Sequence, residues 1–499
     1  MLPLSAHAET PLSAIDWLAE HSMKGSPKLS STPNLRENPA LSATVSTDIE
    51  VTVLRDIQRD AVGLLPPEVT GLPITLWRNS TTQDLLSLLE VSKVSQNPSI
   101  QSLTIRVMLA EGDAPYDSNG KFNFLRSKLE KLIEYGAIDP ALAMLERAAP
   151  LPAPLVPILF DLSMYSEALE PACEQVLQLG AAFENDSARI YCLARRGEWQ
   201  SANIMLTTAE ALQSLTPRET ALLHFFLETG SEKISDLYFS ANSVLTPLEY
   251  RLYEAFGEPV PANDLPLAFS VAELSGDKGW KAQLEAAERL SKSGVFSDNQ
   301  LLGLLTKKPA PASGGIWDRV TMIQDLEQAL EANAPARISD ALRTVWSAVG
   351  TSALATPIAR LFYKRLVAAN LLKQDLVLVH EMGLLTEHYQ DAAKALITRS
   401  RKHRLEVAVA LNRFTFFSPR NEFENAILKA YKTPRIPYSV RNLLAQGKLG
   451  EVILNATLQF EKGSDGDLQD LIEALSTLRH IGLDATARRA TLSLIKLGY

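Results

Sequence analysis

The chain is poor in cysteine and has no long apolar run. Two cysteines among 499 residues allow at most one internal disulfide. No stretch reaches the roughly 18 apolar residues that a membrane-spanning helix needs, so we expect no transmembrane segment. A Gly-rich phosphate loop, a Gly-x-Ser-x-Gly elbow and a dinucleotide fingerprint are also missing. We therefore expect no catalytic residue and no cofactor.

The composition favours a folded, helical protein. Apolar residues make up 46% and charged residues 21% of the chain, so its bulk is not disordered. Alanine and leucine dominate the apolar set and β-branched runs are few, which favours helices over strands. A chain of 499 residues is too long for one compact core and suggests two or three domains or a solenoid. The formal net charge of -9 argues against non-specific binding to nucleic acid.

A short motif recurs at 136–141, 163–168 and 197–202. It reads small residue, any residue, large apolar residue, two of any kind and small apolar residue, and its large positions lie about 27 and 34 residues apart. That spacing is typical of stacked helical hairpins. The motif resembles the turn of a tetratricopeptide-type repeat, where a small residue lets one helix end close to the next and an aromatic fills the gap. We expect Tyr165 and Trp199 to be largely buried. The residues expected to pack at these turns are Gly136, Ile138, Ala141, Tyr165, Ala168, Gly197, Trp199 and Ala202.

Helix periodicity and helix-ending glycines organise the chain. They predict an all-α superhelix of hairpins, a solenoid, with a disordered N-terminal linker. The predicted helices lie at about 122–135, 139–149, 153–164, 166–180, 187–196, 199–213, 217–229 and 279–293. The proline-broken apolar stretch from 62 to 77 is expected to be extended and to lie along the first helices.

The strongest internal break is 307–315, rich in proline, alanine and glycine, which is either a domain boundary or a long surface loop. Helical motifs return on both sides of it, so the chain is either one continuous superhelix or two related halves. The predicted divisions are a residual signal-peptide tail at 1–8, a short helix with a disordered linker at 9–61, an N-terminal helical-repeat half at 62–306, the break at 307–315, and a C-terminal helical-repeat half at 316–499.

The two cysteines, Cys173 and Cys192, fall in consecutive predicted helices. Two antiparallel helices joined by the turn near Phe183 would place both cysteines at a similar distance from that turn, so chain geometry permits a disulfide. Buried free thiols are the alternative. A disulfide would fit an oxidising compartment such as the periplasm.

The N-terminus carries the best sign of location. Ala6-His7-Ala8 fits the small-x-small cleavage site of a secretory signal peptide, although an ordinary flexible start containing two alanines would look the same. We expect a periplasmic protein whose signal peptide is truncated in this chain. Beyond this start, Ile15, Trp17 and Leu18 form a candidate docking motif, because a large aromatic next to a disordered linker has no local core to join. A chance tryptophan in a flexible tail is the alternative.

The remaining polar clusters have structural interpretations. His380-Glu381 lacks the second histidine four residues on that a zinc-protease helix needs, so His380 and His388 are interpreted as helix-surface residues. Helix N-capping by Asp465 or Asp467 is a better interpretation than a calcium loop, because Leu468 stands where a ligand is wanted. We therefore expect no metal site.

The N-terminal residues also carry a resemblance to one family. Ala6-His7-Ala8, 13–18 and the stretch Leu64-Leu65-Pro66-Pro67 resemble a bacterial envelope family of unknown function, some of whose members are labelled "antifreeze glycopeptide polyprotein". No Ala-Ala-Thr array occurs here, and ice binding is not implied. The Ala/Leu-rich superhelix is similar to that of soluble lytic transglycosylases, but their Glu-Ser and Gly-Leu-Met-Gln catalytic motifs are missing.

Two functions are compatible with these observations. The first is a periplasmic scaffold or adaptor that binds another envelope protein or peptide, because solenoids expose concave surfaces. The second is a non-catalytic or degenerate superhelical domain related to peptidoglycan-processing enzymes. A co-purifying protein would favour the first, and a muropeptide bound among carboxylates would favour the second.

Overall fold

The structure is a computed structural model that describes residues 59–166, 168–228, 245–257, 260–400, 402–415 and 417–498. Within these ranges the chain is all-α, with 25 α-helices and no β-strand. One isolated parallel bridge joins Leu65 to Ala110. The predicted all-α fold is confirmed.

Two of the first helices begin with side-chain caps. Thr81 accepts a hydrogen bond from the backbone N of Asp84 at 3.0 Å, and Asn97 accepts one from the N of Ser99 at 3.1 Å, so both side chains satisfy free N–H groups at a helix start. The helices of this part are α2 (Pro67–Thr70), α3 (Thr82–Val91), α4 (Pro98–Leu109), α5 (Asn123–Glu134), α6 (Ile138–Arg147) and α7 (Val156–Tyr165), with 3-10 turns η1 (Arg59–Ala61) and η2 (Ala153–Leu155).

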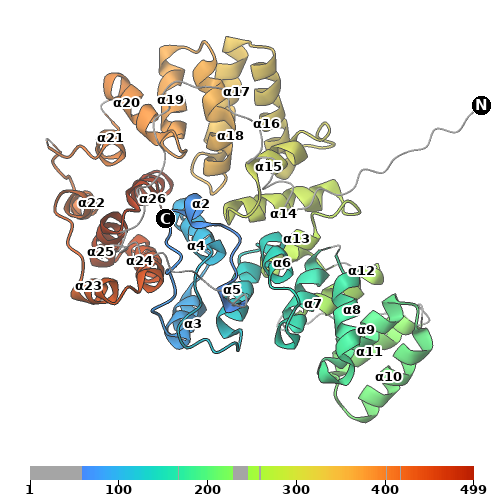
Figure 1. Cartoon of the computed structure of the whole chain (residues 1–499). Helices are drawn as coiled ribbons and strands as arrows, with labels where there is room; N and C mark the ends of the chain where they lie inside the picture. The colour runs from blue at the N-terminus through green and yellow to red at the C-terminus, as the bar shows by residue number, and fades with distance from the viewer. Residues whose placement is uncertain are drawn as a thin grey trace, which may run out of the picture.

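Five further helices form a lobe that extends from α7 (Figure 1). Thr216 and Thr246 open two of them with reciprocal capping boxes, each paired with the glutamate three residues on. The lobe consists of α8 (Glu170–Leu179), η3 (Gly180–Ala182), α9 (Asp186–Arg195), α10 (Trp199–Ala211), α11 (Pro217–Leu227) and α12 (Pro247–Ala255). The helices predicted in this part of the sequence match the observed ones to within a few residues.

The rest of the chain continues as helices that pack on their neighbours. They are η5 (Ala262–Asp264), α13 (Phe269–Ala272), α14 (Trp280–Lys292), α15 (Asp298–Leu305), α16 (Ile316–Glu331), α17 (Pro335–Val349), α18 (Ala355–Ala368), α19 (Lys373–Gly383), α20 (Tyr389–Arg399), α21 (Arg404–Leu411), α22 (Glu422–Lys432), α23 (Tyr438–Ala445), α24 (Leu449–Ser464), α25 (Leu468–His480) and α26 (Asp484–Leu497). Buried apolar side chains from Val62 to Leu494 form one continuous cluster.

The segment 307–315 is a loop between α15 and α16, and helices on its two sides pack together. The rings of Trp280 in α14 and Trp317 in α16 have centroids 5.0 Å apart. Glu288 in α14 accepts two hydrogen bonds from the guanidinium of Arg319 in α16, at 2.7 and 2.8 Å. The chain therefore continues across this break as one packed body.

Helix packing runs in a closed circuit, which we call the ring. It passes from α4 through α5, α7, α13, α14, α15, α18, α19, α20, α21 and α26 and returns to α4. In Figure 1 the C-terminal helices α24 and α26 (red) lie beside α3 and α4 (blue), so the two ends of the described chain meet. An open solenoid has two free ends, whereas this chain covers each end with the other.

The ring closure depends on the proline-broken segment that precedes α3. Leu64 and Leu65 donate their backbone N–H groups to the carbonyl of Leu109 at 2.8 and 2.9 Å, so the start of this segment lies along the end of α4 as predicted. The prediction that 62–77 is extended is wrong in part, because Pro67–Thr70 form the short helix α2 and 74–79 form turns. Proline at the first helical position starts a helix without losing a hydrogen bond. Further on, Trp77 is only 2% exposed. Its ring packs edge-on against Phe124 with centroids 5.1 Å apart, and Gly450 at the start of α24 lies against the same ring.

Hydrogen bonds between the two ends complete the closure. The backbone N of Gly450 donates to the carbonyl of Leu76 at 3.1 Å. Asn97 Nδ2 donates to the carbonyl of Ala490 at 2.9 Å, and Ser95 Oγ donates to Glu461 Oε1 at 2.5 Å. Each bond joins positions more than 350 residues apart in the sequence.

A disulfide joins Cys173 in α8 to Cys192 in α9, with the two Cα atoms 5.1 Å apart. That distance lies within the roughly 4.4–6.8 Å range expected for a disulfide. Both cysteines are buried, at 7% and 0% exposed. The hairpin of α8 and α9 therefore carries a covalent link, which is the geometry that the sequence permitted.

The repeat-turn residues divide into buried and exposed groups. Buried as expected are Gly136, Ile138, Ala141, Tyr165 and Ala202. Tyr165 packs edge-on against Phe269 of α13, with ring centroids 5.1 Å apart.

The prediction that Trp199 is largely buried is wrong, because its side chain is 45% exposed. α10 lies at the outer side of the lobe, and the ring of Trp199 lies 6.4 Å from that of Phe226 in α11, measured between centroids. Ala168 and Gly197 are also exposed. α8 begins only at Glu170, so Ala168 precedes the helix that it was expected to pack into place.

Three predicted features of the N-terminus fall on residues that the structure does not describe. These are the signal-peptide tail at 1–8, residues 9–58 of the short helix and linker predicted at 9–61, and the docking motif of Ile15, Trp17 and Leu18. The last residues of the predicted linker, Arg59–Ala61, are described, and they form the 3-10 turn η1 with Asp60 buried, so the linker prediction is wrong there.

Candidate interaction site

A hollow of about 420 Å³ lies where the first repeat turn faces α13, α14 and α15. We call it the hollow. Its floor and one side come from residues 136–140, the turn between α5 and α6, and its other side comes from residues at or near the ends of α13, α14 and α15. It therefore forms at the place where the first helices of the ring meet those that follow the lobe (Figure 1).

The turn that lines the hollow has a tightly determined backbone. Gly136 has a φ of 75°, the left-handed region that L side chains rarely adopt. A Cβ there would also come within 2.7 Å of Leu290 Cδ2. The backbone N–H of Ala137 donates back to the carbonyl of Leu132 at 2.8 Å, which closes the end of α5. Gly136 thus lets the turn approach α14 closely and directs the first residues of α6 toward the hollow.

Apolar side chains form the opposite wall. Val271 and Leu274 come from α13 and the residues after it, and Leu290 from the last turn of α14. Val295 and Phe296 come from the connection to α15. Apart from buried Leu290, these side chains are half-buried, so the wall presents apolar surface to the hollow.

Among the residues that the structure describes, Asp139 is the only charged one that lines the hollow. It belongs to the first turn of α6 and is exposed on its solvent side. The surrounding protein still desolvates its carboxyl group and raises its pKa above the usual value. No lysine, arginine or histidine among the described residues forms an ion pair with it. The hollow therefore combines apolar walls with one uncompensated carboxylate.

Gln300 and Gly303 of α15 complete the lining. Ser297 caps this helix by accepting a hydrogen bond from the backbone N of Gln300 at 3.3 Å. Gly303 stands inside the helix, where glycine costs roughly 0.5–1 kcal/mol relative to alanine. A Cβ at this position would meet no heavy atom within 4 Å. Packing within the chain therefore does not require glycine at 303.

A second hollow of about 420 Å³ lies near α21, α22, α24 and α26. Its charged residue, Glu424, already has partners, because Arg420 donates its backbone N–H to Glu424 Oε2 at 2.8 Å. Its asparagine, Asn421, is the N-cap of α22 and accepts from the backbone N of Glu424 at 2.8 Å. These polar groups are already hydrogen-bonded to backbone N–H groups at the start of α22, so the first hollow is the better candidate site.

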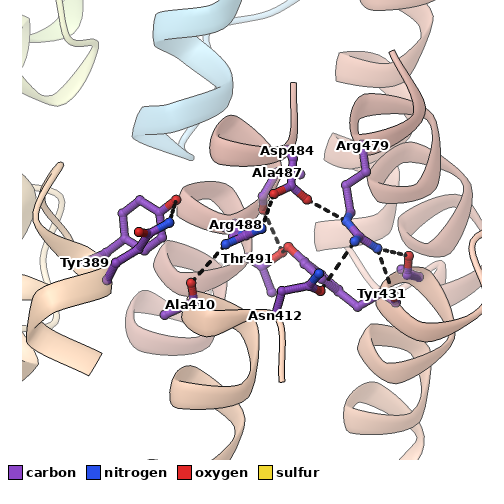
Figure 2. A network of polar contacts seen from close by, with 11 residues as sticks. Tyr389, Ala410, Asn412, Tyr431, Arg479, Asp484, Ala487, Arg488 and Thr491 are labelled. Atoms are coloured by element: carbon purple, nitrogen blue, oxygen red, sulfur yellow. Dashed lines mark hydrogen bonds and ion pairs between the residues drawn. The ribbon is translucent and has the colours of Figure 1, made fainter. Parts of the chain in front are cut away.

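A polar network near the C-terminus is internal (Figure 2). Asp484 accepts from Arg479 Nε at 2.8 Å and forms an ion pair with Arg488. Arg479 also donates to the carbonyl of Tyr431 at 2.8 Å, and Arg488 to that of Ala410 at 3.2 Å. Two arginines held by one carboxylate thus cap the C-terminal ends of α22 and α21. The network's role is structural.

Two histidines that follow α18, His380 and His388, contact the ring of Tyr363. The ring of His388 stacks on Tyr363 with centroids 5.9 Å apart, and His380 meets Tyr363 edge-on at 6.3 Å. His380 is buried, not on the surface as predicted, because α18 covers this side of α19. Burial and the nearby Arg399 lower the pKa of His380. Among the residues with described positions, no group of three or more His, Cys, Asp or Glu is arranged to hold a metal.

Helix capping by Asp467 is confirmed. Its side chain accepts hydrogen bonds from the backbone N of Gln469 at 3.0 Å and of Asp470 at 3.1 Å, at the start of α25. The carboxylate is thereby engaged by the helix start, as in other N-caps.

Sequence reasoning found one side of the hollow and missed the other. The motif at 136–141 pointed to the turn, but no sequence signal connected it with α13–α15. Gly303 lies in α15, a helix that the sequence analysis did not predict, so no sequence signal pointed to this residue. The described residues of the other two copies of the motif, at 163–168 and 197–202, do not line the hollow.

Comparisons with known proteins do not identify a function for the hollow. No protein-family model, curated protein or solved structure matches the chain. In the part of the chain that the structure covers, no helix is both long and apolar enough to cross a membrane.

Proposed function

We propose that this chain is a helical-repeat scaffold or adaptor that binds another protein or peptide of the cell envelope. The observation that carries the proposal is the hollow, an open site with apolar walls and an unpaired carboxylate. Large open apolar sites with a few polar groups are typical of ligand and partner binding.

The proposed location is the periplasm. The disulfide between Cys173 and Cys192 supports an oxidising compartment, since structural disulfides are rare in the cytosol of most organisms. The small-x-small sequence at Ala6-His7-Ala8 points the same way. Alkylation of the cells' free thiols during denaturing lysis tests this, because both cysteines should then resist alkylation until a reductant is added. Rapid alkylation of both would contradict it.

Site-specific photo-crosslinking tests the partner-binding function. A photoreactive residue at Gln300, on the lining of the hollow, is compared with the same residue at Arg337, an exposed position on α17. We expect one protein to crosslink from position 300 and not from 337. That protein, once purified, should bind the chain at a fixed stoichiometry in calorimetry.

The same experiment can refute the proposal. Equal crosslinking from both positions, or a captured protein that does not bind when purified, would mean that the hollow is not a partner site. The N-terminal segment with Ile15, Trp17 and Leu18 is part of the proposal as a second contact. Deleting residues 9–22 should weaken partner capture and leave thermal stability nearly unchanged.

A further inference from the structure

We propose that the hollow binds a peptide segment in which a large apolar side chain stands next to a lysine or arginine. The inference rests on the proposed function and specifies the chemistry of its partner. It depends on three separate features, which are the apolar walls, the lone carboxylate and the glycine inside α15.

The size and walls of the hollow suit an apolar side chain. Its volume of about 420 Å³ lies within the roughly 300–1,000 Å³ typical of ligand sites. Val271, Leu274, Val295 and Phe296 are only half-buried, so they retain apolar surface that a bound side chain would remove from water. Such burial is the main favourable contribution to binding.

The carboxylate determines the charge of the partner. Within the described ranges, Asp139 is the only charged residue on the lining, and no lysine, arginine or histidine forms an ion pair with it. Its desolvated position raises its pKa, and a lysine or arginine placed beside it would compensate the ionised form. The chain as a whole carries a net charge of -9, which also favours the approach of a basic segment and disfavours an acidic one.

Gly303 explains how the hollow stays open. A helix-interior glycine weakens its helix, and neither a positive φ nor a close neighbour requires it here. A larger side chain at 303 would project into the hollow instead of into packed protein. Glycine at 303 therefore keeps space open in the hollow, whereas the packing of the chain would accept a larger residue there.

The test uses a display library of random seven-residue peptides selected on the full chain. We expect the enriched peptides to place Leu, Ile, Met or Phe next to Lys or Arg. One enriched peptide is then synthesised, together with a version in which its basic residue is replaced by glutamine. Binding of both is measured by fluorescence anisotropy to the wild type and to three variants.

The variants separate the features of the site. Gly303→Leu should fill the hollow and weaken binding about ten-fold or more, while keeping the melting temperature at or above that of the wild type. Gly276→Leu is the matched control, since position 276 is also open but does not line the hollow, and its binding should be unchanged. Asp139→Asn should weaken the basic peptide about five-fold and leave the glutamine version unaffected.

Several results would overturn the inference. These are a library without enrichment, enrichment of acidic peptides, or binding that Gly303→Leu and Gly276→Leu affect equally. If the photo-crosslinked partner still binds Gly303→Leu with full affinity, the peptide chemistry proposed for the hollow is wrong while the adaptor function stands. If the wild type binds no partner in the crosslinking experiment, the proposed function itself is wrong.

Discussion

Replacing Gly450 by alanine should loosen the contact that closes the ring. Gly450 is the second residue of α24, and its backbone N donates to the carbonyl of Leu76 at 3.1 Å. A Cβ at this position would overlap ring carbons of Trp77 and lie 2.9 Å from the carbonyl oxygen of Leu76. Trp77 cannot simply move away, because it is 2% exposed and packs on Phe124.

The magnitude follows from two opposing effects. Alanine in place of glycine favours a helix by up to about 1 kcal/mol. Overpacking a filled site costs roughly 1–3 kcal/mol. The upper limit is complete expulsion of the indole, which would resemble a Trp→Ala change at roughly 3–5 kcal/mol. We expect Gly450→Ala to lower the free energy of unfolding by about 1–2 kcal/mol.

The matched control is Gly303→Ala. This glycine is also helical, but its Cβ would meet nothing within 4 Å. The same substitution should therefore stabilise the protein by roughly 0.5–1 kcal/mol. Urea denaturation of both variants measures the difference in sign. Hydrogen exchange read by mass spectrometry should show faster exchange in residues 72–97 and in the first turn of α24 for Gly450→Ala alone.

One outcome would refute this reasoning. If Gly450→Ala is as stable as the wild type and exchanges at the wild-type rate in both segments, the contact with Trp77 does not hold the ring closed. If both glycine variants are destabilised, helix propensity at these positions has been misjudged.

Three further predictions concern the lobe and α7. Tyr165→Ala should cost roughly 3–5 kcal/mol as a cavity mutation, whereas Trp199→Ala at its 45% exposed position should cost much less; equal losses in urea denaturation would contradict the packing described. Removing the disulfide by Cys173→Ala with Cys192→Ala, which are 19 residues apart, should lower stability by about 3 kcal/mol in the chain-entropy model, and an unchanged unfolding midpoint would show otherwise. Burial raises the pKa of Asp161 to about 6 from 3.8, so its contribution to stability is fully present below pH 4 and is lost as pH rises through about 6. The free energy of unfolding of Asp161→Asn should therefore rise relative to that of the wild type between pH 4 and 7, by about 1.4 kcal/mol per pKa unit. A difference in melting temperature between the two proteins that stays constant across this range would exclude the effect.

Local interactions explain why much of the lobe could be predicted. Thr216 caps α11 through its reciprocal box with Glu219, and Gly197 ends its helix with a φ of 85°. Such effects act within one turn or one hairpin and are visible as residue patterns. The pairing of Cys173 with Cys192 is predictable for the same reason, because the two residues belong to one helical hairpin.

Residue patterns alone predicted the all-α class and the helices and turns between 122 and 229, because hydrogen bonding and helix propensity depend on near neighbours. They did not predict α2 or α15. Long-range packing settles the remaining features. It leaves Trp199 exposed while burying Tyr165, because a helix from elsewhere in the chain covers one turn and not the other. It closes the ring through Trp77 and Gly450, and it assembles the hollow from residues 136–140 and α13–α15. Apolar patterns show that a surface must be buried, but the partner that buries it is chosen by packing between segments far apart in the chain.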